Sequence, residues 1–230
     1  MRFRFAFAAL ATLATTPVMA AGPSGFYFGF DLGQSSYDVD MRDLESDLSD
    51  WIDESGLDLL DASTEESESA FTWGIIAGYQ IGSYFAVEAG YFDLGEAEYK
   101  VRGTVTDGSL VSDVELAARM DSTGFAVSAL GMFPIADSGW DVFGRVGVYF
   151  GSNDIEGDLT IDDVVDSGTD DTSSTSFLWG AGVSYTRGQW TSRIEYQQFQ
   201  GVGEDGDFDG LDVDRIVFGA VYRTGFGGWR

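Results

Sequence analysis

The sequence contains no histidine and no cysteine, and these absences exclude several kinds of chemistry. Without histidine, the chain cannot form a serine hydrolase with a histidine base or a zinc site with imidazole ligands. Without cysteine, it forms neither disulfides nor thiolate metal centres, although it remains compatible with an oxidising compartment. We therefore expect no enzymatic activity and no cofactor.

Basic residues are also scarce. The chain has 12 Lys and Arg against 39 Asp and Glu, a formal net charge of −27. Such a surface has no basic patch to neutralise phosphates, which argues strongly against nucleic acid as a partner. Proline occurs 3 times and glycine 31 times in a chain with 15% aromatic residues, so the glycines are better explained as strand and interior residues than as linkers.

Residues 1–20 have the three parts of an export signal. Two arginines near the start are followed by an apolar run over 5–15 and by small residues up to Ala20. The apolar run is shorter than the ~20 residues that a membrane-spanning helix needs. We expect cleavage after Ala20 or Ala21, which leaves residues 21–230 as one domain.

The clearest pattern is a period of two over residues 71–95. Large apolar side chains alternate with small or polar ones, and the alternation is interrupted only at Gly82 and Ser83, so the stretch predicts a β-hairpin. Most of the large apolar side chains share one face, and the other carries glycines, a glutamine and Glu88. This distribution suits a barrel wall with its apolar face toward lipid and its other face toward a crowded polar lumen.

The same alternation occurs in eight segments, over 26–37, 71–81, 85–95, 123–134, 140–151, 176–186, 190–197 and 215–224. The connections between them are alternately short and long. An even number of strands can close without an edge, and this alternation is typical of outer-membrane barrels. We predict an all-β, membrane-spanning, antiparallel up-and-down β-barrel of eight strands, with acidic external loops over 38–70, 153–171 and 204–214.

Several motifs within these segments resemble the OmpA-type outer-membrane barrel of the OmpA-like porin family. They are Gly78-Tyr79-Gln80, Tyr84, Glu88, Gly90-Tyr91, Leu94-Gly95, Phe133-Pro134-Ile135, Arg145, Gly147, Arg193 to Gln197, and Gly219 to Arg223. Their order and spacing together are specific. The resemblance implies a barrel in the bacterial outer membrane with a lumen filled by side chains. Its expected partners are outer-membrane lipids, lipopolysaccharide and the barrel assembly machinery.

The chain departs from that family in two respects. Larger members carry a peptidoglycan-binding domain after the barrel, whereas we expect a barrel alone here. Family members also place a lysine and a glutamate in the lumen as a gate pair, and the matching positions hold an apolar residue near Ala129 or Leu130, and Ser184. The remaining lumen charges form an expected cluster of Asp31, Glu88, Arg145, Arg193 and Glu195. These charges could provide a proton or ion pathway, but a set of mutually satisfied ion pairs is the favoured interpretation.

Two further motifs lie in the predicted loops. Asp205, Asp207 and Asp209 alternate as at the start of a calcium loop, but Ile216 stands where the pattern requires a bidentate glutamate. We expect no specific metal site and only diffuse binding of divalent cations by the loops. In the first loop, apolar residues at helical spacing predict a short amphipathic helix, and they are Met41, Leu44, Leu48, Trp51 and Ile52.

Three classes of function are compatible with a small barrel. The first is a structural and surface-interaction protein with an external ligand that the sequence does not identify. The second is a small porin or transporter that passes ions or small apolar solutes. The third, a lipid-modifying enzyme, is disfavoured by the lack of histidine.

Overall fold

The computed structural model describes residues 24–38, 58–67, 69–106, 111–161, 164–203 and 210–224. Its strands are β1 (Gly25–Asp38), β2 (Asp58–Ser67), β3 (Ser69–Ile81), β4 (Phe85–Thr106), β5 (Val111–Pro134), β6 (Trp140–Ile161), β7 (Val164–Arg187), β8 (Trp190–Val202) and β9 (Leu211–Arg223). In these residues no helix is long and apolar enough to cross a membrane. The predicted signal peptide, the predicted amphipathic helix and Asp205, Asp207 and Asp209 lie outside the described residues.

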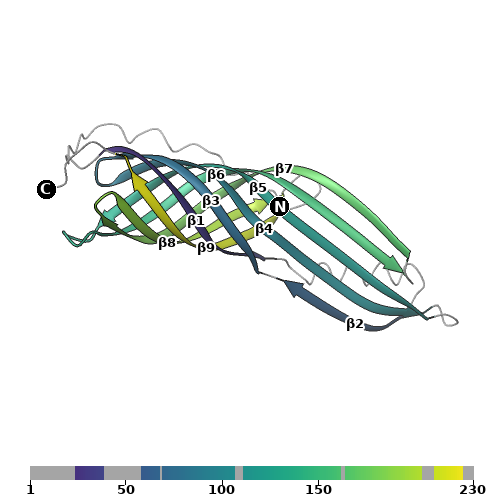
Figure 1. The fold of residues 1–230 in the computed structure, drawn as a ribbon. Helices are drawn as coiled ribbons and strands as arrows, with labels where there is room; N and C mark the ends of the chain where they lie inside the picture. The colour runs from purple at the N-terminus through teal and green to yellow at the C-terminus, as the bar shows by residue number, and fades with distance from the viewer. Residues whose placement is uncertain are drawn as a thin grey trace, which may run out of the picture.

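The strands form one closed antiparallel sheet (Figure 1). Strand β1 pairs with β3 on one side and with β9 on the other, and β4 pairs with β5, so the sheet has no free edge in the barrel. Strand β2 pairs only with the outer part of β4 and continues the line of β3. The barrel therefore has eight positions around its circumference, and the predicted fold is confirmed.

Short turns gather at one end of the barrel, which we call the turn end. They join β3 to β4, β5 to β6 and β7 to β8. Three of their glycines adopt positive φ angles, 66° at Gly82, 81° at Gly139 and 64° at Gly188, which side chains with a Cβ rarely adopt. The opposite end, which we call the loop end, carries the long connections.

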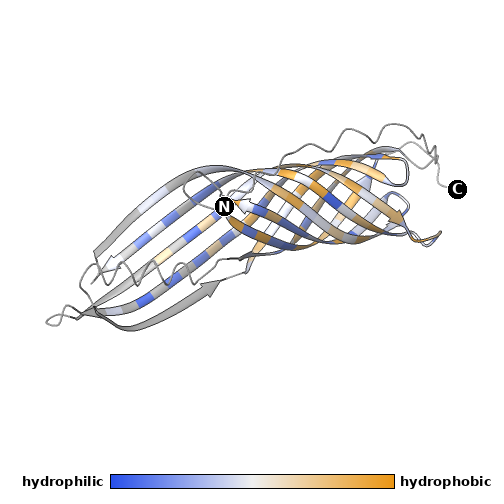
Figure 2. Ribbon diagram, turned by 180° about the vertical axis from the view of Figure 1, so that it is seen from behind, coloured by the Kyte–Doolittle hydropathy of each residue, from blue (hydrophilic) through white to orange (hydrophobic). Residues whose placement is uncertain are grey.

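Hydrophobic residues concentrate in the barrel part of the molecule (Figure 2), and many of the large ones are exposed on its outer wall. Large side chains stand 62% exposed at Phe26, 64% at Phe125 and 72% at Phe133, and many others are half-exposed. A continuous apolar surface of this kind would drive association in water and is typical of contact with lipid. Aromatic pairs mark the two ends of the band, with Phe26–Tyr79, Trp140–Tyr185 and Trp190–Tyr222 at the turn end and Trp73–Tyr91 and Trp179–Tyr196 toward the loop end.

Where the structure describes the predicted long loops, most of their residues belong to strands, so the prediction is wrong for those parts. Residues 153–161 and 164–171 belong to β6 and β7, which remain paired out to Ile161 and Val164. Strands β4 and β5 likewise pair out to Thr106 and Val111. Together with β2 they form a sheet that projects beyond the shorter strands β1, β3, β8 and β9 (Figure 1). Part of the third predicted loop, over 204–214, begins β9.

The lumen is also less polar than predicted. A cluster of buried apolar side chains occupies the part nearer the loop end, namely Phe92, Leu94, Tyr149, Leu178, Phe199, Val202 and Val213, each at most 1% exposed. These rings and aliphatic groups fill a narrow interior that water does not reach, so apolar side chains are as stable there as in a soluble core. The buried charged residues gather in a separate layer below them.

Candidate functional site in the barrel lumen

A layer of six buried ionisable side chains crosses the middle of the lumen. Its members are Asp31 on β1, Glu88 on β4, Arg145 on β6, Arg193 and Glu195 on β8, and Arg215 on β9, all at most 4% exposed. Strand alternation turns them inward, because apolar neighbours on the same strands face outward. Three arginines and three carboxylates make this charge layer neutral overall.

Glu88 lies at the centre of the contacts. Its Oε1 accepts a hydrogen bond of 2.8 Å from Arg193 Nη1 and one of 2.9 Å from the hydroxyl of Tyr27. Its Oε2 accepts one of 2.6 Å from Arg145 Nη2. Both oxygens of this buried carboxylate are therefore engaged, two of the three bonds coming from charged donors.

Arg145 joins this carboxylate to a second one. Its Nε donates to Glu195 Oε1 at 2.5 Å and its Nη2 to Glu195 Oε2 at 3.1 Å, a two-point contact. Its Nη1 donates to the hydroxyl of Ser128 at 2.7 Å. The planar guanidinium thus bridges β4, β5 and β8 across the lumen, which a flexible ammonium group would do less rigidly.

Arg215 forms the other half of the layer, and the sequence analysis did not include it. Its Nη2 donates to Asp31 Oδ1 at 2.7 Å and its Nη1 to Gln197 Oε1 at 2.9 Å. The guanidinium also lies over the ring of Phe92, 5.1 Å from its centroid. The sequence does indicate this position, because Arg215 directly precedes the outward-facing Ile216 and strand alternation therefore places Arg215 inward.

The five lumen residues that the sequence predicted all lie in the same layer as Arg215. Arg193 also approaches Asp31, with Nη2 3.6 Å from Oδ2, and Glu195, with Nε 3.8 Å from Oε2. These longer approaches link the two halves of the layer into one charge network. In the residues that the structure describes, no group of acidic side chains has a metal-binding arrangement.

The apolar cluster lies directly above the charge layer, toward the loop end. The rings of Tyr149 and Phe199 meet edge to face, with centroids 5.0 Å apart, and Phe92 meets Phe199 at 6.2 Å. Phe92 also contacts Arg215, so the two layers touch. The hydroxyl of Tyr149 is hydrogen-bonded to Ser122 at 3.2 Å, which leaves this buried phenol with a partner.

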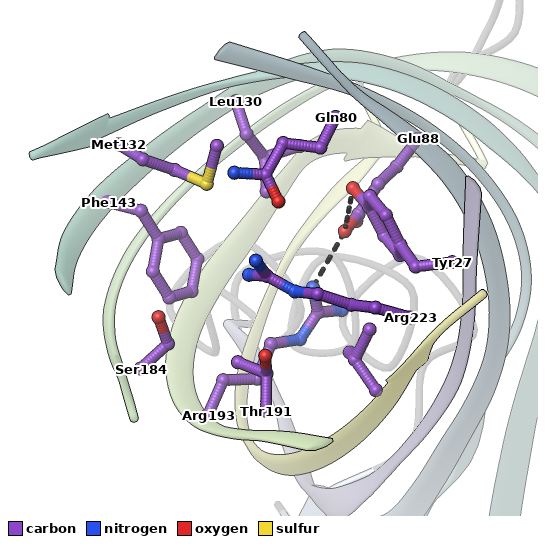
Figure 3. Close-up of a pocket in the computed structure, with 11 residues that line it drawn as sticks. Tyr27, Gln80, Glu88, Leu130, Met132, Phe143, Ser184, Thr191, Arg193 and Arg223 are labelled. Carbon is purple, nitrogen blue, oxygen red and sulfur yellow. Dashed lines mark hydrogen bonds and ion pairs between the residues drawn. The ribbon is translucent and has the colours of Figure 1, made fainter. Parts of the chain in front are cut away.

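A small cavity lies below the charge layer, at the turn end (Figure 3). Its volume is about 30 Å³, and it is lined by Tyr27, Gln80, Glu88, Leu130, Met132, Phe143, Ser184, Thr191, Arg193, Val221 and Arg223. Leu130 and Ser184, the residues that the resemblance matches to the expected gate pair, both line it. Leu130 faces the lumen and Ala129 faces outward, which resolves the choice left open by the sequence.

Comparison with solved structures returns outer-membrane proteins of low identity. Neisserial surface protein A is 15% identical, with a TM-score of 0.49 and coverage of 88% of this chain and 99% of that one. Ail of Yersinia pestis is 13% identical (TM-score 0.38; 88% and 98% covered) and OprG of Pseudomonas aeruginosa is 14% identical (TM-score 0.42; 89% and 95%). No curated protein matches the chain. The family model of the OmpA-like transmembrane domain matches residues 23–228, and the chain therefore belongs to that family.

Proposed function

We propose that the protein is an integral outer-membrane barrel with a structural and surface-interaction role, and that its lumen is plugged by side chains. The observation that carries this proposal is the stacking of two layers in the lumen. A neutral network of six ionised groups lies below a cluster of packed rings and aliphatic side chains. A permeating ion would have to separate paired charges in the first layer and then cross the second without water.

Both steps are costly. Removing one partner from a buried pair costs roughly 3–5 kcal/mol, and an ion in an apolar layer loses most of its hydration. Phe92, Tyr149 and Phe199 are each at most 1% exposed, and this close packing of the upper layer supports the proposed plug. The lumen thus supports stability rather than transport.

The projecting sheet supports a role at the surface. Its outward side carries charged residues, including Glu98, Lys100 and Arg119, with Arg119 Nη2 3.1 Å from Glu98. A sheet with continuous hydrogen-bonded strands holds such residues in a fixed arrangement, as a flexible loop would not. With a net charge of −27, the surface favours cationic partners and divalent ions over polyanions.

Single-channel recording of the refolded protein in planar bilayers tests the plug. We expect no openings above baseline for the wild type. The matched variant is Tyr149→Ala combined with Phe199→Ala, which removes the packed rings but leaves every charge in place. Regular openings of the wild type would instead favour a small porin, the alternative function.

Two cellular measurements test location. We expect the mature protein in the outer-membrane fraction, and amino-terminal sequencing to show cleavage after Ala20 or Ala21. Recovery in the inner-membrane fraction would contradict the proposal.

A further inference from the structure

Arg223 differs from the three arginines of the charge layer. Arg145, Arg193 and Arg215 each contact at least one carboxylate directly. The guanidinium of Arg223 makes no ion pair or hydrogen bond with the described residues, and Figure 3 shows it extending into the cavity at the turn end. Asp141 on β6 acts on its charge through space, but no contact joins the two groups.

The lining of the cavity offers this guanidinium neutral oxygens, and its one carboxylate is the engaged Glu88. Four of the lining side chains are apolar, namely Leu130, Met132, Phe143 and Val221. Among the polar groups, Gln80 donates its amide to Gly82 and Thr191 pairs with Thr186. A guanidinium has five N–H donors, and a half-buried one is stabilised by any acceptor that can reach it.

The negative charge of Glu88, at the floor of the cavity, is offset by the positive charges of Arg145 and Arg193. Its two oxygens already accept bonds from Arg145, Arg193 and Tyr27. Arg193 itself lines the cavity, although its Nε and Nη2 lie toward Glu195 and Asp31 in the charge layer, at 3.8 and 3.6 Å. A cation entering the cavity would meet two guanidinium groups, whereas an anion would meet donors.

The size of the cavity limits the occupant. A volume of about 30 Å³ is far below the ~300 Å³ of pockets that hold drug-sized ligands. One water occupies roughly 10–15 Å³ on this measure, so the space holds about two waters or one compact ion. We propose that this cavity binds one compact monovalent anion, of the size of chloride or formate, with Arg223 as its principal ligand.

Chloride is the probe for the test, and gluconate, a monovalent anion too large for the cavity, is its control at equal ionic strength. Nitrogen–proton NMR spectra of the arginine side chains are recorded while sodium chloride replaces sodium gluconate. We expect the Nε–H signal of Arg223 to shift to saturation. Arg187, exposed beside the β7–β8 turn, serves as an internal reference and should change little.

Variants separate the proposed contacts. Arg223→Gln should weaken chloride binding at least tenfold, measured by the broadening of the chloride resonance, while Arg187→Gln leaves it unchanged. Ser184→Glu, which places a carboxylate on the cavity wall, should abolish binding by competition. Asp141→Asn, which removes the carboxylate that acts on Arg223, should strengthen it.

Several outcomes would overturn the proposal. A shift at Arg223 that grows linearly with chloride, or that matches the shift at Arg187, would indicate an adventitious ion only. Binding that survives in both Arg223→Gln and Ser184→Glu would place the anion elsewhere. If chloride and gluconate give the same spectra, the cavity holds water alone. None of these outcomes bears on the plug, because conductance is measured independently.

Discussion

Replacing Glu88 with glutamine should destabilise the barrel by about 3–5 kcal/mol, the usual cost of breaking a buried ion pair from one side. The structure gives a reason to expect the upper part of that range. The substitution removes the charge that both Arg145 and Arg193 contact, at 2.6 and 2.8 Å, and takes the neutral layer to a net charge of +1. Tyr27 also loses a charged acceptor.

The complementary substitution, Arg193→Met, takes the charge layer to a net charge of −1 and should lower the free energy of unfolding by a similar amount. Combining the two restores neutrality, so the double variant should be more stable than the sum of the single losses predicts, by about 1–3 kcal/mol. Recovery should be incomplete, because Arg145 keeps only an amide oxygen at position 88. A pair isolated from other charges would recover nearly all of the loss.

The assay is the urea midpoint of the barrel folded in detergent, followed by tryptophan fluorescence and by gel mobility. The control is Glu98→Gln with Arg119→Met, an exposed pair of similar geometry for which solvent screening leaves only a small loss. Strictly additive losses for Glu88 and Arg193 would show that the side chains do not interact. They would also contradict the assignment of the lumen and lipid faces.

Three further outcomes are expected. Because the barrel has no free edge, the folded protein should migrate faster unboiled than boiled in a denaturing gel, and equal mobility of a preparation shown to be folded by circular dichroism would count against closure. Burial, with nearby Asp93, Asp154 and Glu96, raises the pKa of Asp121 beyond the outer aromatic pairs, so this group destabilises the folded state at neutral pH. That penalty should disappear as pH falls below the pKa of the unfolded chain, and Asp121→Asn should raise the urea midpoint at pH 7 but not at low pH; an equal gain at both would refute the assignment. Calorimetric titration with calcium should show weak, non-stoichiometric binding that Asp207→Asn leaves unchanged, whereas one tight site lost in that variant would favour the calcium loop.

The positions of the barrel strands could be predicted from the sequence because lipid imposes a strict rule. Outward side chains in the band are predominantly apolar, so an alternation such as Phe71, Ile75 and Tyr79 indicates a strand and its outward face. The same alternation places Asp31, Glu88 and Arg193 in the lumen, and the structure has them there. Arg215 follows the same rule.

The partners within the lumen could not be derived in this way. Glu88 contacts residues on β6 and β8, strands that do not pair with β4, so the contact depends on the stagger of the strands and the diameter of the barrel. Alternation specifies the face of a residue but not its height along the barrel axis. The sequence analysis also missed the apolar cluster. Phe92 and Phe199 face inward, but they are apolar like the outward-facing residues, so their type does not indicate their face.

The loop end shows why the predicted strands stop too early. Inside the band, apolar side chains face outward. Beyond it, the outward positions of the same strands carry Glu96, Glu98 and Arg119, while Ala97 and Met120 are buried on the other face. The polarity of the two faces therefore inverts where lipid ends, near the irregularity between Asp93 and Glu96 in β4. A rule based on outward apolar residues fails at that height, although the hydrogen-bonded ladder continues. Because β4, β5, β6 and β7 run from the barrel into the projecting sheet, the barrel holds that sheet in place.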